Sequence, residues 1–182
     1  MDRLKIPVSF FDKITNTKKS EIKDLQYFID LITKYEDYDP QLRSLYTSNK
    51  SQYDNLKKKL PGIVFGKYSE RKDSACAQYS PCMGFDIDGI ANYEGVSLIL
   101  QKLQKIEYVF AAFPSVSFLG IRILIWSDST IKTRRAYYSS LCNKLCRDLK
   151  QDNFKIDTST KNISRLWYYA PLPPGTFYIN TS

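Results

Sequence analysis

Two aspartates one residue apart are the feature of this sequence best suited to chemistry. Asp86 and Asp88 lie in the run Gly84-Phe85-Asp86-Ile87-Asp88-Gly89, which has the apolar character of a buried strand. Because strand side chains alternate between faces, both carboxylates are expected on one face, with Phe85 and Ile87 turned to the core. Carboxylates this close repel each other unless a cation lies between them, and Mg²⁺ or Mn²⁺ prefers oxygen ligands. A polar strand end that runs into a turn is the alternative interpretation.

Composition limits the kinds of protein this chain can be. Its 182 residues suffice for one well-buried domain, or for a core with a helical appendage. The chain has no histidine, which excludes a histidine triad, a histidine base and histidine metal ligands. The net charge of +8 indicates an anionic partner, most commonly nucleic acid. No apolar run approaches the ~20 residues of a membrane span, and no secretory signal is recognisable, so we expect a cytoplasmic protein.

Four cysteines offer a possible structural metal site. A four-thiolate zinc site is conceivable, but the spacings between these residues fit zinc patterns poorly. Burial as small apolar residues is the favoured interpretation. The four are Cys76, Cys82, Cys142 and Cys146.

Residues 1–61 are predicted to form a helical N-terminal region. Ser20 is a plausible N-cap for a helix that continues to about Glu36 with one apolar face, and two shorter helical pieces follow before Pro61-Gly62. The last piece carries three consecutive lysines, which are either a solvated face or a contact to nucleic acid. These are Lys57, Lys58 and Lys59.

Residues 62–182 alternate between strand and helix patterns and are predicted to form a single α+β core. From residue 82 the predicted order is strand, helix, strand, strand, helix, strand, which is the order of an RNA-recognition-motif-like (split βαβ) sheet with both helices on one face. The predicted elements span residues 83–87, 92–106, 108–113, 121–126, 130–150 and 155–156, with further strands at 63–65 and 166–169.

That topology gathers other polar residues beside the two aspartates. The first and third strands are neighbours in such a sheet, and Asp157 directly follows the last strand. Three carboxylates can hold two divalent metals about 4 Å apart, while hydroxyls and an arginine suit a triphosphate. Less specific roles remain open: Ser115 and Ser117 as turn caps, Asp157 as the cap of the next turn, and Arg122 as a surface residue. The residues expected on this surface besides the aspartate pair are Ser115, Ser117, Arg122 and Asp157.

Several segments together resemble the archaeo-eukaryotic primase (primase-polymerase) superfamily. The similarity is greatest to its VirE amino-terminal domain group, from primase-helicase proteins of bacterial mobile elements. The run Gly84 to Gly89 is similar to the first metal motif, and Asp157 to the third. Residues 113–122 are similar to a Ser-Pro-Ser-Gly-x-Gly-Leu-Lys segment. The matching segments are 58–66, 84–89, 113–122, 156–157 and 162–168.

The resemblance implies a template-directed nucleotidyltransferase that acts in replication of a mobile element. It implies Mg²⁺ or Mn²⁺ as cofactor, bound by Asp86, Asp88 and Asp157. It also implies single-stranded DNA and nucleoside triphosphates as partners, with a helicase domain or protein. The nucleotide contacts that it implies are Ser115, Ser117, Arg122 and Arg165.

The chain departs from the superfamily pattern at two positions. Many members have a Ser-x-His motif, whereas this chain has no histidine and carries Arg122 in the corresponding hairpin. Phe118 replaces the first glycine of the loop. Two alternative functions therefore stay open: a nucleic-acid-binding module of the same fold without turnover, and a metal-dependent nuclease. We expect Asp86→Ala and Asp88→Ala to abolish activity. Because the two carboxylates repel each other when no metal is bound, neither variant should be less stable than wild type.

Overall fold

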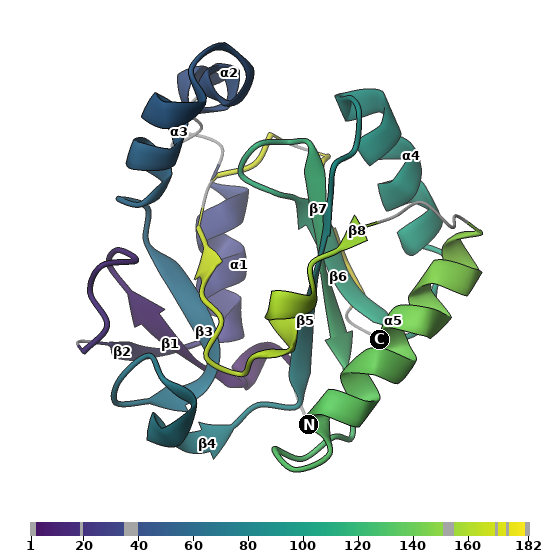
Figure 1. Cartoon of the computed structure of the whole chain (residues 1–182). Coiled ribbons are helices and arrows are strands. Elements are labelled where there is room, and N and C mark those ends of the chain that lie inside the picture. The colour runs from purple at the N-terminus through teal and green to yellow at the C-terminus, as the bar shows by residue number, and fades with distance from the viewer. Residues whose placement is uncertain are drawn as a thin grey trace. The chain divides into compact units, whose positions relative to one another are not determined.

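The computed structural model describes residues 3–18, 20–34, 40–150, 155–169, 171–173 and 175–180, and the chain divides into two compact units (Figure 1). Unit 1 comprises Met1–Ser80 and Ile163–Pro174, and unit 2 comprises Pro81–Asn162 and Gly175–Ser182. The chain thus passes twice from unit 1 into unit 2. The boundary expected between residues 61 and 62 lies inside unit 1.

Unit 1 is an antiparallel sheet with three α-helices. The strands follow the order β2-β1-β3-β4, and β9 pairs with β3. They are β1 (Pro7–Phe11), β2 (Glu21–Asp24), β3 (Gly62–Tyr68), β4 (Cys76–Tyr79) and β9 (Trp167–Tyr168). The helices are α1 (Leu25–Thr33), α2 (Pro40–Ser48) and α3 (Lys50–Lys57), with short 3₁₀ turns η1 (Arg3–Lys5) and η3 (Asp73–Ala75).

The helical character expected of residues 1–61 is wrong for the first 24 residues, where β1 and β2 lie. The first helix begins at Leu25 and not after Ser20; the carboxylate of Asp24 caps it by accepting from Tyr27 N at 2.9 Å. Residues 21–24 pair with β1 instead, in register with Pro7 to Phe10. Ile22, expected on the buried helix face, is therefore 48% exposed. The predicted end near Glu36 lies outside the described residues.

Unit 2 is a second antiparallel sheet, with the strand order β10-β6-β7-β5-β8. Strand β5 is an interior strand and pairs with both β7 and β8. The strands are β5 (Cys82–Asp88), β6 (Val109–Pro114), β7 (Gly120–Trp126), β8 (Lys155–Ile156) and β10 (Tyr178–Ile179). The helices are α4 (Tyr93–Leu103) and α5 (Arg134–Leu149), with the 3₁₀ turn η4 (Thr158–Lys161).

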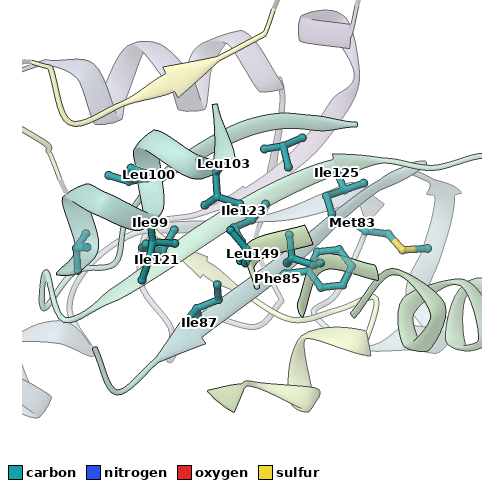
Figure 2. Close-up of a cluster of buried hydrophobic side chains, with 14 of the residues drawn as sticks. Met83, Phe85, Ile87, Ile99, Leu100, Leu103, Ile121, Ile123, Ile125 and Leu149 are labelled. Atoms are coloured by element: carbon teal, nitrogen blue, oxygen red, sulfur yellow. The ribbon is translucent and has the colours of Figure 1, made fainter. Parts of the chain in front are cut away.

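One hydrophobic core joins α4 and α5 to one face of the unit 2 sheet (Figure 2). Alternate residues of β5 and β7 point into it, with Ile99, Leu100 and Leu103 of α4 and Leu145 and Leu149 of α5. The strand residues are Met83, Phe85, Ile87, Ile121, Ile123 and Ile125. The apolar spacing of α5 predicts Tyr137, Leu141, Leu145 and Leu149 on its inward face. Tyr137 is wrong: it is 43% exposed, and its neighbour Tyr138 is buried and stacks on Phe85.

The predicted α+β class is confirmed, with antiparallel sheets and five α-helices among the described residues. The strands and helices expected from residue 82 to residue 156 are present within a few residues of their predicted bounds. Within the described ranges, every helix is too short or too polar to cross a lipid bilayer.

Candidate metal and nucleotide site

The two aspartates of β5 lie on the sheet face opposite the helices. Phe85 and Ile87 are fully buried in the core with α4 and α5. Asp86 and Asp88 alternate with them, Asp86 half-buried and Asp88 exposed. The same-face arrangement expected from the sequence follows from this alternation. Two carboxylates therefore lie on one face near the C-terminal end of β5.

Arg122 is the direct cross-strand neighbour of Asp86. The register of β5 with β7 pairs Asp86 with Arg122 and Asp88 with Gly120. Arg122 Nε lies 3.5 Å from Asp86 Oδ1, and the side chains are 7% and 17% exposed. Opposed residues of an antiparallel pair share a face, so the cation lies on the carboxylate face. The buried guanidinium thus offsets the charge of Asp86, whereas Asp88 remains open to solvent.

Asp157 joins the same row on the other side of β5. Its backbone N–H donates to Asp86 O at 2.9 Å, which continues the β5–β8 register by one residue. Its carboxylate accepts from Ser159 N at 2.8 Å and Ser159 Oγ at 2.7 Å, so it caps η4. The Tyr138 hydroxyl donates to Asp157 O at 3.0 Å, and burial raises the pKa of this tyrosine. Backbone contacts on two sides therefore hold Asp157 beside Asp86, while its side chain caps η4.

The loop between β6 and β7 brings hydroxyls to Asp88. Ser115 N donates to Gly120 O at 2.9 Å, and the hydroxyls of Ser115 and Ser117 lie 3.1 Å apart. A Cβ at Gly120 would lie 2.7 Å from Ile87 O, 3.0 Å from Ser115 Oγ and 3.2 Å from Asp88 Oδ1. The close approach at Gly120 therefore requires glycine. It also places the Ser115 hydroxyl and the Asp88 carboxylate against the same α-carbon.

The donor types fit a hard divalent cation, but the side chains are not arranged as its ligands. Carboxylates and hydroxyls are the oxygen donors that Mg²⁺ and Mn²⁺ take. In the part of the chain that the structure describes, no three Asp, Glu, Cys or His side chains are gathered closely enough to hold a metal ion. Asp86 is directed to Arg122 and Asp157 to Ser159. Metal binding by all three aspartates therefore requires these side chains to rotate.

The lysine run and Arg165 belong to unit 1, as part of a basic and aromatic surface. Lys57 Nζ lies 5.1 Å from the ring centre of Tyr168 and 5.8 Å from that of Tyr53. Lys58, Lys59 and Arg165 are exposed.

The sequence did not single out three further residues of unit 1. They are Lys50, which lies over the rings of Tyr46 and of the buried Tyr53, Tyr46 itself, and Arg71. Burial lowers the pKa of the Arg71 guanidinium, and the charge of nearby Arg165 lowers it further. The signal was present in part: Tyr46, Lys50, Tyr53 and Lys57 are four, three and four residues apart, the spacing of one helix face.

Comparison with known proteins identifies a family. The family described as BT4734-like, N-terminal domain, matches residues 55–171. That range contains the whole of the row Arg122, Asp86 and Asp157 and the Ser115 loop. Neither the curated proteins nor the solved structures gave a match. Because this match covers well over half of the chain, the chain belongs to the BT4734-like N-terminal domain family.

Proposed function

We propose that this chain is a primase-polymerase-type domain: a divalent-metal-dependent, template-directed nucleotidyltransferase in the replication of DNA. The observation that carries the proposal is the pair Asp86 and Asp88 on one sheet face, with Asp157 hydrogen-bonded to the backbone of Asp86. Carboxylates in such a row are what a metal-assisted phosphoryl transfer needs. The motif resemblance described above points to the same reaction and to a mobile element.

The arrangement of unit 2 supports an RNA-recognition-motif-like catalytic sheet. Its order β6-β7-β5-β8 puts the second, third, first and fourth strands of the strand-helix-strand-strand-helix-strand sequence side by side. All pairs are antiparallel, and both helices contribute to one core on one face. This order and pairing are those expected of a split βαβ sheet and support that assignment. The other face carries the polar row and is the proposed catalytic surface.

Each polar residue has a proposed role in the reaction. Asp86, Asp88 and Asp157 would hold Mg²⁺ or Mn²⁺, which supplies activation of the attacking 3′-hydroxyl and neutralisation of phosphate charge. Ser115 and Ser117 would donate to the triphosphate from their hydroxyls. The 3′-oxygen would bond to the α-phosphorus as the bond to the leaving pyrophosphate breaks.

Arg122 is the proposed replacement for the superfamily histidine. Its guanidinium lies in the same row as the aspartates, 3.5 Å from Asp86. A guanidinium remains charged at every working pH and can bind phosphate through two parallel hydrogen bonds. The proposed role is therefore twofold: it offsets the charge of Asp86 before nucleotide binds, and it contacts phosphate afterwards.

The proposed partners are single-stranded DNA, nucleoside triphosphates and a helicase domain or protein, in the cytoplasm. The cations and rings of unit 1 suit a single strand, since lysines bind phosphates and tyrosines stack on bases. Lys57 and Tyr168 are the closest such pair of the lysine run. Lys58, Lys59 and Arg165 add exposed charge to the same unit.

Metal-dependent extension of a labelled primer on a single-stranded template tests the proposal. We expect incorporation with Mn²⁺ or Mg²⁺ by the wild-type chain, and none by Asp88→Ala. Template binding without incorporation would favour a binding module without turnover, an alternative that the Arg122–Asp86 pair supports by occupying one carboxylate. Cleavage of the strands with Mn²⁺ and no nucleotide would instead favour a nuclease.

A further inference from the structure

Phe118 has a backbone conformation that side chains of its size rarely adopt. Its φ is +61°, in the left-handed region that glycine prefers. Among the described residues, Lys150 is the one other non-glycine with positive φ, and it ends α5 in the common left-handed cap. Phe118 ends no helix and lies between two hydroxyl-bearing residues and Gly120. Conformations of this kind concentrate at sites of function.

The ring of Phe118 contacts a second aromatic side chain from another element. The ring centres of Phe118 and Tyr93 are 5.4 Å apart, with the planes tilted by 59°. Tyr93 is 45% exposed and is the first residue of α4, a helix that the Asn92 side chain caps by accepting from Gly95 N. The N–H of Ile90 donates to Leu119 O at 3.1 Å, which ties the start of α4 to the loop. Two rings thus stand next to each other at a fixed junction.

This junction adjoins the proposed phosphate site. Phe118 follows Ser117, whose hydroxyl accepts from Leu119 N at 3.3 Å and lies 3.1 Å from that of Ser115. Ser115 in turn lies against Gly120 together with Asp88. The rings are therefore only a few residues along the chain from the hydroxyls and the carboxylate that would bind a triphosphate. A partly exposed pair of aromatic rings at this point suits the base at the other end of a nucleotide.

We propose that Phe118 and Tyr93 form a stacking surface for the base of the nucleotide whose triphosphate the Ser115–Gly120 loop receives. This inference rests on the proposed function and assigns the base contact within it. Aromatic rings bind every base through its π-face, so all four nucleotides are accepted. Purines are bound more tightly than pyrimidines because they offer a larger face.

Equilibrium binding of ATP and of inorganic tripolyphosphate to the full chain, both with Mn²⁺, separates base contacts from phosphate contacts. Phe118→Leu and Tyr93→Leu keep the apolar bulk and remove the π-face. We expect each to weaken ATP binding about fivefold or more, the lower end of one base stacking on one ring, and to change tripolyphosphate binding less than about twofold. Phe118→Trp should restore ATP affinity. Tyr137→Leu on α5, at a tyrosine of similar exposure in the same unit, is the matched control.

Each outcome decides the proposal. Unchanged ATP affinity in both leucine variants overturns it, and so does an equal loss of ATP and tripolyphosphate binding, which indicates a disturbed loop. Loss of affinity for a single-stranded oligonucleotide with unchanged ATP affinity assigns the rings to the strand and overturns the nucleotide assignment. A wild-type chain that binds neither ATP nor tripolyphosphate contradicts the proposed function itself. Melting temperatures within about 2 °C of wild type confirm that the variants are folded, since a loss of about 1 kcal/mol would shift the midpoint by 2–4 °C.

Discussion

The ion pair between Asp86 and Arg122 predicts that Asp86 stabilises the fold. Repulsion between the two aspartates, taken alone, predicts the opposite. Repulsion between Asp86 and Asp88 predicts that removing either charge leaves the metal-free protein no less stable. Arg122, however, is 5% exposed and faces Asp86 across the β5–β7 pair. Asp86→Asn leaves that guanidinium buried beside a neutral amide. We therefore expect Asp86→Asn to destabilise the protein and Asp88→Asn not to.

The expected magnitude follows from the distance and the burial. At the observed 3.5 Å, Coulomb attraction at an effective dielectric constant of 20 is about 5 kcal/mol. The net loss is smaller, because the Asp86 side chain is 17% exposed and solvent screens its charge. Breaking one side of a buried pair typically costs about 3–5 kcal/mol, so we expect about 2–3 kcal/mol here. For a chain of this size the melting temperature should fall by roughly 5–10 °C.

Urea denaturation of the full chain in EDTA measures this prediction. The double variant Asp86→Asn/Arg122→Met removes both charges and should recover part of the loss, with a coupling energy of at least about 1 kcal/mol. Asp88→Asn, which removes an exposed carboxylate from the same strand, is the matched control and should stay within about 0.5 kcal/mol of wild type. An Asp86→Asn protein as stable as its Asp88→Asn counterpart would refute the reasoning.

Three further predictions concern the loop, the core and unit 1. Gly120→Ala should destabilise the protein by about 1–3 kcal/mol in urea denaturation, because the new Cβ would lie 2.7 Å from a backbone oxygen of β5. Burial raises the pKa of the Cys82 thiol to about 12, above its unfolded value near 9, so this thiol favours the fold below pH 9. Its contribution should fall by up to about 1.4 kcal/mol per pH unit from pH 9 to pH 12, and Cys82→Ala should flatten the stability profile there. Lys57→Ala should reduce the salt dependence of single-stranded DNA binding by about 0.7 in log–log slope, while Lys102→Ala on α4 should not.

Most elements of unit 2 could be predicted because their signals are local. The apolar periodicity of α4 and the apolar runs of β5, β6 and β7 identify each element without reference to its neighbours. Strand β10 was not predicted, because two residues become a strand only by pairing with β6. On α5 one inward position was misplaced, since Tyr137 and Tyr138 are adjacent and chemically similar. Which of them is buried depends on the stacking of Tyr138 on Phe85.

The strands of unit 1 could not be predicted because their pairing is non-local. Residues 21–24 are polar except for Ile22 and precede a helix, so they resemble its first turn, and only pairing with β1 makes them a strand. β1 itself is five residues long and pairs with β3 from more than 50 residues further along the chain. The division into units has the same origin, since β9 returns from residue 167 to pair with β3.

The candidate site was predictable in its members but not in its pairings. The shared face of Asp86 and Asp88 follows from strand alternation, and Asp157 from its place after β8. The Arg122–Asp86 pair depends on the register between β5 and β7, two strands that α4 and β6 separate in the sequence. The cap that Asp157 forms with Ser159 was one of the alternatives that the sequence left open, and it is the side-chain role found here.

The central claim is that Asp86, Asp88 and Asp157 form a divalent metal site for nucleotide chemistry. Anomalous X-ray scattering from crystals soaked with Mn²⁺ and a non-hydrolysable nucleoside triphosphate tests it most directly. We predict manganese peaks bound by carboxylate oxygens of Asp86 and Asp88, with Asp157 turned from Ser159 toward them and the triphosphate on the Ser115–Gly120 loop. A bound triphosphate with no manganese at these carboxylates, or manganese only at other sites, would contradict the claim.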